Sequence, residues 1–308
     1  MNTKRVGWAY LWMTATFVIA SLFVSYFSPY MGISITALLS ELCLLIPVLC
    51  CLIRGRAQIP VQLKFRGIKP ATVLLVLVYH ICCYPLVIAM NSFTMAISDN
   101  EALDLTAQFQ GEPFFLIWLF VGLVGPVVEE LIFRGAILGG LRTTGRIFTP
   151  ILLSALLFGL IHMNVNQFSY TLCMGIFWGL LAEATGSIIP SMICHITMNS
   201  VSVILAYLLE DSIGGLEEII EAGGAGAALS YAATGFTFLI ISIFTTMLAM
   251  LMLRVISLNE GRTGCFENIF RQKSKAERYG HLFSIPLIIG IAIAAVVTIT
   301  MLIADFMN

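Results

Sequence analysis

Long apolar stretches dominate this chain of 308 residues. A helix that crosses the hydrocarbon core of a bilayer needs about 20 apolar residues, so stretches of that length predict membrane spans. The composition agrees, because 59% of the residues are hydrophobic and only 11% are charged, whereas about a quarter of a soluble domain is charged. We therefore predict an all-α, polytopic membrane helix bundle with about nine transmembrane helices, or eight if one stretch lies in the interface. The candidate spans cover residues 7–28, 33–53, 71–93, 114–142, 147–163, 168–184, 187–209, 233–255 and 283–304.

The spans divide into three predicted regions. Residues 1–113 form an amino-terminal membrane region of three helices, and residues 114–209 form a core that carries polar motifs. Residues 210–308 comprise an outer amphipathic loop and two carboxyl-terminal membrane helices. Within that loop, residues 211–231 mix apolar and acidic side chains and run into a glycine-rich stretch. This pattern indicates a short amphipathic helix that serves as a surface connector or as a lid.

The charged residues predict how the bundle is oriented. Lysines and arginines flank the predicted spans on one side, while the connections on the other side are acidic. The positive-inside rule then places the amino terminus in the cytoplasm and the carboxyl terminus outside. With no organelle signal, we expect a multi-pass protein of a prokaryotic plasma membrane. The net charge of −1 and the absence of a basic block give no reason to expect nucleic acid as a partner.

Three short polar clusters interrupt the apolar helices of the core. They are Glu129 to Arg134, Phe158 to His162, and His195 to Asn199. A charged residue at the centre of a membrane helix costs about 3 kcal/mol on insertion scales, so these groups need a reason to be there. Pairing alone would require only opposite charges, and the imidazoles and the amide therefore indicate chemistry.

Helical periodicity predicts how the side chains in each cluster face. Residues four apart share a face, so Glu130 can pair with Arg134, while Glu129 lies about 100° around the helix as a free carboxylate. The same spacing puts Phe158 with His162 and His195 with Asn199. At 1.5 Å per residue, the four cavity-facing groups lie within about 10 Å of one another in depth.

Two features of the backbone around the clusters predict close packing and a local break. Pro126 lies one turn before the glutamates, where it frees a backbone carbonyl and kinks the helix. Gly135 with Gly139, and Gly175 with Gly179, are small-residue pairs that allow helices to approach closely.

These groups match the needs of amide hydrolysis. A carboxylate and a neutral histidine can take a proton from water and so make a nucleophile. A second histidine and an asparagine can donate to the oxyanion that forms when this water attacks a carbonyl.

The three clusters resemble the motifs of the CPBP family, the CAAX-protease and bacteriocin-processing membrane proteins. The family pattern is EExxxR, FxxxH and HxxxN on successive core helices, and here it reads EELIFR, FGLIH and HITMN. The resemblance covers roughly residues 114–205 and implies an intramembrane endopeptidase. By this resemblance, Glu129 and His162 activate water, His195 and Asn199 form the oxyanion site, and Glu130 with Arg134 holds the geometry. Phe158 completes the second motif.

The resemblance also bears on cofactors, partners and competing functions. A metal-free glutamate mechanism is favoured because no HExxH motif and no cysteine-histidine zinc spacing occurs. A zinc ion held by Glu129, His162 and His195 is the alternative. The expected substrate is a membrane-associated peptide or protein in the lipid bilayer, with either a CAAX-like tail or a leader, pheromone or bacteriocin precursor. Two other functions stay open, namely a non-catalytic scaffold or immunity protein and an ion-coupled transporter.

Overall fold

The computed structural model describes residues 1–27, 31–55, 63–98, 109, 112–208, 225–271 and 273–307. Every regular element within these residues is a helix, which confirms the predicted all-α class. The helices outside the 114–144 segment are α1 (Thr3–Phe27), α2 (Ile33–Arg54), α4 (Pro70–Met95), α9 (Phe148–Ile161), α10 (Val165–Thr185), α11 (Ile189–Leu208), α13 (Ala225–Asn259), α14 (Cys265–Phe270), η5 (Lys275–Glu277) and α15 (Ile285–Met307).

Residues 114–144 form one continuous helical segment that changes its hydrogen-bonding pattern along its length. Two π-helical stretches flank the glutamates, where the backbone bonds span five residues instead of four. The elements in order are α6 (Phe114–Ile117), η2 (Trp118–Val124), α7 (Gly125–Glu130), η3 (Leu131–Ile137), α8 (Leu138–Leu141) and η4 (Arg142–Thr144).

Each predicted span corresponds to a helix, and the polytopic bundle is confirmed. By length and composition, seven helices in the described part of the chain can cross a membrane, rather than the nine expected. The other two expected spans are α9, which has only 14 residues, and α10, which has 21 residues but is less apolar. The reason for the polarity of α10 is internal bonding. Asn166 is fully buried, and its amide donates to Asn91 Oδ1 of α4 at 3.1 Å and to Thr94 Oγ1 at 3.2 Å.

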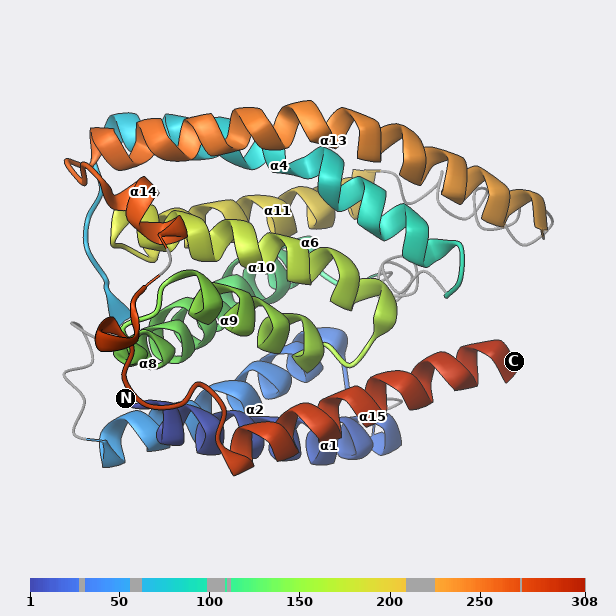
Figure 1. Ribbon diagram of the computed structural model, residues 1–308. Coiled ribbons are helices and arrows are strands. Elements are labelled where there is room, and N and C mark those ends of the chain that lie inside the picture. Colours follow the sequence, from blue (N-terminus) through green and yellow to red (C-terminus); the bar gives the residue numbers. More distant parts are fainter. Residues whose placement is uncertain are drawn as a thin grey trace.

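The helices pack in three groups (Figure 1). Along one side, α13 lies against α4, and on the opposite side α1 packs between α2 and α15. The helices that carry the polar motifs, α7, α9 and α11, lie between these groups with α10. The motif residues are therefore in the interior of the bundle. The first residues of α1 and the last residues of α15 lie at opposite ends (Figure 1).

Close packing of α9 on α10 depends on the predicted glycine pair. A Cβ atom on Gly175 would lie 2.9 Å from Ala155 Cα, and one on Gly179 would lie 2.8 Å from Ile151 Cγ2. These separations are too short for a methyl group, so the two helices approach to backbone distance only because both positions are glycine. This contact fixes α9 against α10 two turns before His162, which follows the last residue of α9.

The last long helix begins earlier than expected. We predicted a span from residue 233, but α13 begins at Ala225 and includes the end of the glycine-rich stretch at residues 223–226. Its 35 residues give a length of about 50 Å, well beyond the roughly 30 Å of a hydrocarbon core. Residues 209–224, which contain most of the predicted amphipathic segment, lie outside the described residues.

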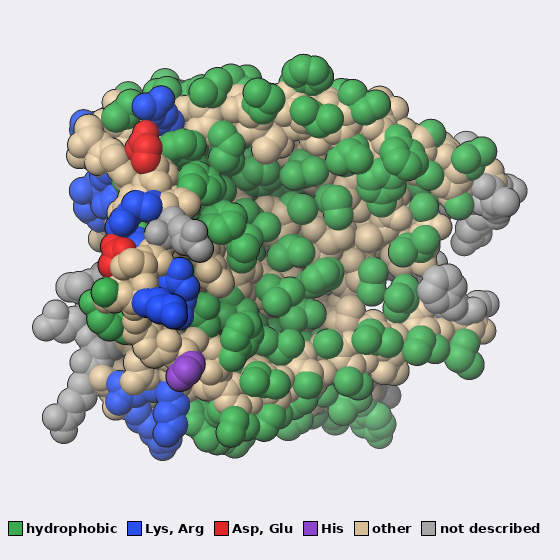
Figure 2. Space-filling model, in the orientation of Figure 1, with side chains coloured by type: hydrophobic (Ala, Val, Ile, Leu, Met, Phe, Trp, Pro, Cys, Tyr) green, Lys and Arg blue, Asp and Glu red, His purple; other side chains and the backbone are tan. Residues whose placement is uncertain are grey.

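Lysine and arginine side chains gather at one end of the molecule, while the rest of the visible face is largely hydrophobic (Figure 2). The helix ends at this place are the start of α1, the end of α2 and the end of α13. An apolar belt beside a basic end is the pattern expected of a membrane protein whose basic end lies at a membrane surface.

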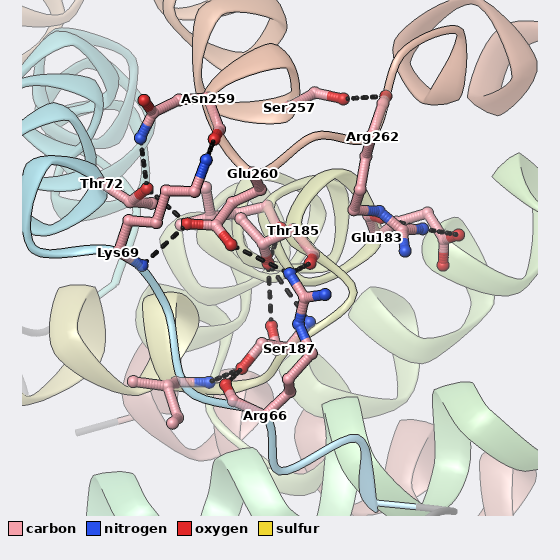
Figure 3. A network of polar contacts seen from close by, with 12 residues as sticks. Arg66, Lys69, Thr72, Glu183, Thr185, Ser187, Ser257, Asn259, Glu260 and Arg262 are labelled. Carbon is pink, nitrogen blue, oxygen red and sulfur yellow. Dashed lines mark hydrogen bonds and ion pairs between the residues drawn. The ribbon is translucent and has the colours of Figure 1, made fainter.

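Ion pairs tie the helix ends together at this basic end (Figure 3). Glu260, just after α13, accepts from Arg66 Nη2 at 2.9 Å and from the Lys69 backbone N–H at 2.9 Å. The Ser187 hydroxyl, in the turn between α10 and α11, donates to the Arg66 carbonyl at 2.5 Å. The network therefore holds the turn at Ser187, two residues before α11 begins and eight residues before His195.

Glu183 is the second acidic centre of this end. It is 3% exposed and lies beside three cations, with Lys64 Nζ at 3.4 Å, Arg262 Nη2 at 4.0 Å, and Arg142 in direct contact. Burial, reinforced by the charges of Arg142 and Arg262, lowers the pKa of Lys64 to about 8. One carboxylate thus compensates three cations only in part.

Candidate active site

The two π-helical stretches and Pro126 decide how the first polar motif is presented. Pro126 has no backbone N–H to donate. In the π-helical register this leaves the carbonyl of Val121, five residues earlier, without its donor on the same helix. In the α-helical register it leaves the carbonyl of Gly122, four residues earlier, without one. Donors come instead from α11. Asn199 Nδ2 donates to Val121 O at 3.1 Å, and Ser200 Oγ donates to Gly122 O at 3.4 Å. The predicted free carbonyl is therefore present, and it docks the third motif onto the first.

Glu129 faces both motif histidines. Its Oε2 atom lies 3.4 Å from His195 Nε2, and its Oε1 atom lies 3.9 Å from His162 Nε2. The side chains of Glu129, His162 and His195 are only 13%, 16% and 5% exposed, respectively. The sequence-based prediction that three helices direct these groups to one place is met.

The other ring nitrogens determine which tautomer each histidine favours. His162 Nδ1 lies 2.8 Å from the Phe158 carbonyl, which can only accept, so Nδ1 carries the proton in that contact. His195 Nδ1 lies 3.1 Å from Glu130 Oε1 and likewise donates to an acceptor. In the neutral form, both histidines therefore present a lone pair at Nε2 towards Glu129. Three acceptors meeting at one point require a shared proton or a donor such as water.

Glu130 is the fixed point behind these groups. It is fully buried, and its Oε1 atom accepts a hydrogen bond from His195 Nδ1 and forms an ion pair with Arg134 Nη1 at 2.8 Å. The predicted pair with Arg134 is therefore present, but Glu130 also orients His195, which helical spacing within one helix did not reveal. The Arg134 guanidinium carbon lies 4.4 Å from the centroid of the Phe158 ring. This cation–π contact gives Phe158 a packing role behind the histidines.

Trp178 is a site residue that sequence reasoning missed. Its ring stacks on His195 with centroids 4.2 Å apart and lies 5.1 Å below the guanidinium carbon of Arg134. Trp178 belongs to α10, between the two other motif helices, and comes three residues after Gly175. No polar pattern marks it, and its place beside a small-residue pair was the only available signal.

A cavity of about 420 Å³ connects these groups. Its walls include Glu129, His162, His195 and Asn199, so all four predicted catalytic residues border one space. Glu41 of α2, which lies outside the three motifs, also lines it. The remaining wall is largely apolar, with Phe109, Phe120, Val121, Met174, Trp178 and Met198 among its members.

The donor types for a zinc ion are present, but their arrangement is not that of a metal centre. Zinc sites use imidazole nitrogens and carboxylate oxygens, which Glu129, His162 and His195 supply. Among the described residues, no group of three or more histidines, cysteines, aspartates or glutamates is placed to hold a metal ion. We therefore derive no step through a metal.

The fold and the cavity together define a class, namely polytopic helical membrane proteins with a buried glutamate–histidine centre. Comparison with known proteins identifies a family that the core resembles. Residues 111–201 match the model of the type II CAAX prenyl endopeptidase Rce1-like family. Over 90 residues the chain is 31% identical to the "Putative membrane peptidase YdiL" of Bacillus subtilis (strain 168). That alignment covers 29% of this chain and 37% of the relative. The resemblance to the CPBP and CAAX protease family is thus confirmed for the segment that bears the three motifs.

Proposed function

We propose that the protein is an intramembrane endopeptidase that hydrolyses a peptide bond in a membrane-associated peptide or protein. One observation carries the proposal, namely that Glu129 faces the Nε2 atoms of two histidines inside a cavity of about 420 Å³. The family match of residues 111–201 supports the same reaction class. The likeness spans only about a third of the curated relative's length, so activity and substrate rest on this chain's own residues.

The proposed nucleophile is a water molecule held between Glu129 and His162. Glu129 takes one proton as the water oxygen bonds to the carbonyl carbon, which leaves a tetrahedral intermediate with a negative oxygen. When the C–N bond breaks, the proton passes from Glu129 to the leaving nitrogen. The products are a carboxylic acid and an amine, so atoms and charge balance.

In this mechanism, His195 and Asn199 stabilise the oxyanion. Only protonated His195 carries an N–H at Nε2, and Glu130 at its Nδ1 atom supports that charged form. Asn199 has two amide hydrogens, of which one bonds the Val121 carbonyl. The second is free to donate into the cavity that Asn199 lines. The Pro126 break thus positions a donor as well as a helix.

The decisive experiment uses purified protein in lipid nanodiscs with a library of hydrophobic peptides, and mass spectrometry identifies the cleavage products. Wild type should cut a subset of peptides, and Glu129→Gln should reduce cleavage by a factor of at least about 100, the lower end for general acid–base catalysis. Glu267→Gln is the matched control because Glu267 is exposed on the basic end, 3.3 Å from Arg254 Nε. Equal cleavage by wild type and Glu129→Gln contradicts the proposal.

The same assay addresses the open alternatives. A zinc enzyme loses activity to a chelator and recovers it on zinc addition, whereas the metal-free mechanism is unaffected. Farnesylated and unmodified versions of one peptide separate CAAX-like substrates from leader, pheromone or bacteriocin precursors.

The non-enzymatic alternatives need other experiments. The scaffold or immunity function is favoured if cells that carry Glu129→Ala with His162→Ala keep a phenotype that a deletion loses. Proton flux in liposomes tests the transporter.

A further inference from the structure

Glu41 is a carboxylate in the cavity wall that the proposed mechanism does not use. It comes from α2, which packs against α7, and lies close enough to Glu129 for their charges to interact. Its Oε1 atom lies 3.1 Å from the position that a Cβ of Gly125 would occupy. Glycine at 125 therefore provides the space that the carboxylate fills.

The surroundings of Glu41 differ from those of the three most buried carboxylates. Glu130 meets Arg134, Glu183 meets Arg142 with two further cations, and Glu260 meets Arg66. Within the described residues, by contrast, Glu41 forms no ion pair, and its inaccessible Oε2 atom has no hydrogen-bond partner. A carboxylate in an apolar wall is costly unless it is neutral or meets a positive partner. The chain provides such partners elsewhere, so an unpaired carboxylate beside the reacting groups points to a partner that arrives with the substrate.

The charge of two connecting segments of the sequence favours a cation as that partner. The cavity lies away from the basic end, because Glu41 is 13 residues, or about 20 Å of helix, before Arg54. The sequence connections at residues 96–113 and 209–224 contain nine acidic residues and no lysine or arginine. Acidic segments raise the local concentration of positively charged ligands and repel anionic ones.

We propose that Glu41 binds a protonated nitrogen of the substrate and so selects membrane-associated peptides with a basic group near the scissile bond. The nitrogen belongs to a lysine or arginine side chain or to a free amino terminus. This inference rests on the proposed peptidase function and names the substrate class of the same cavity. Glu41 acts in specificity, whereas Glu129 and the histidines act in bond cleavage.

The test compares matched peptides that differ in one charge. A peptide cut by wild type is made with lysine or with uncharged norleucine at each position, and with a free or an acetylated amino terminus. Wild type should favour the charged version in kcat/KM by about tenfold or more, the effect of one hydrogen bond to a charged group. In Glu41→Gln the ratio should fall to near one, whereas Glu267→Gln, a variant of an exposed residue outside the cavity, should keep the wild-type ratio. The position at which lysine matters distinguishes a side chain from the amino terminus.

Binding separates failure of this inference from failure of the proposed function. Fluorescence anisotropy of the labelled lysine and norleucine peptides in nanodiscs measures Kd without turnover. The lysine peptide should bind wild type about tenfold more tightly than norleucine, and this preference should vanish in Glu41→Gln but persist in Glu267→Gln. If Glu41→Gln keeps the preference in either assay, or wild type has none, the inference is wrong. Charge-dependent binding without any cleavage would overturn the peptidase proposal and leave the cation site standing.

Discussion

The buried pair of Glu130 and Arg134 gives the sharpest prediction of the structure. Their side chains are 0% and 1% exposed, and the two are joined by a 2.8 Å contact. Replacing one partner strands the other charge in the bundle, which typically costs about 3–5 kcal/mol. Arg134→Met also loses the cation–π contact with Phe158, which is worth about 2 kcal/mol when desolvated, whereas Glu130→Gln keeps this contact. We therefore expect Glu130→Gln and Arg134→Met each to destabilise the protein severely.

The double variant separates stability from activity. Glu130→Gln with Arg134→Met leaves no stranded charge, so it should regain most of the lost stability, because a buried ion pair is often replaceable by neutral groups. Its rate of peptide cleavage should remain about 100-fold or more below that of wild type, because His195 Nδ1 no longer donates to a carboxylate that supports its charged form. Arg134→Lys is the conservative control, which keeps the charge but loses the planar contact with Phe158.

Thermal unfolding in detergent and peptide cleavage are measured on all four variants. The single variants should unfold well below wild type, and the double variant should lie closer to wild type than either. A double variant that is no more stable than the weaker single variant refutes the stranded-charge argument. A double variant with wild-type cleavage refutes the orienting role of Glu130.

Three further predictions concern packing, pH and topology. Gly175→Val should separate α9 from α10 and lower both the unfolding temperature and cleavage, because the site of its Cβ is 2.9 Å from Ala155 Cα; the exposed Gly226→Val, with open space around it, is the control. Lys64 has a pKa of about 8 in the folded protein, below its ordinary value of 10.5, so its charged form costs stability below pH 8 and this cost disappears as the pH rises from 8 to 10.5. Lys64→Met should therefore raise the unfolding temperature at pH 7 and change it little at pH 11, and the opposite trend would contradict the assignment. Alkaline phosphatase fused after α15 should be active if the carboxyl terminus lies outside, and an inactive fusion would reverse the predicted orientation.

The sequence predicted well what depends on one helix at a time. Apolar length located every long helix, and four-residue spacing paired Glu130 with Arg134. Facing within a helix also separated Glu129 from Glu130 correctly, because rotation about a single axis is fixed by residue count. The proline break was predictable for the same reason, since the missing N–H is a property of Pro126 itself.

Features that depend on the rotation of one helix against another were not predictable. The bond from His195 to Glu130 joins α11 to α7, and sequence spacing contains no information on that angle. The same holds for Asn199, expected to face only the cavity but bonded to the Val121 carbonyl as well. Trp178 was missed because its contact with His195 is made by an apolar ring on a helix without a motif. The predicted start of α13 at residue 233 was wrong because glycine and alanine near residue 225 belong to the helix and do not interrupt it.

The contrast between paired and unpaired carboxylates links stability with function in this bundle. Glu130 has its cation supplied by the same helix, at four-residue spacing, so its charge is compensated before any substrate arrives. Glu129, one residue earlier, is turned about 100° away, and its ion-pair contacts within the described residues are with imidazoles, whose protonation can change. A fixed guanidinium beside Glu129 would hold it permanently as an ion-paired carboxylate and weaken it as a base. Under the proposed mechanism, the adjacent glutamates therefore divide two incompatible tasks, because a base has to exchange its proton while the group that orients His195 has to keep its charge.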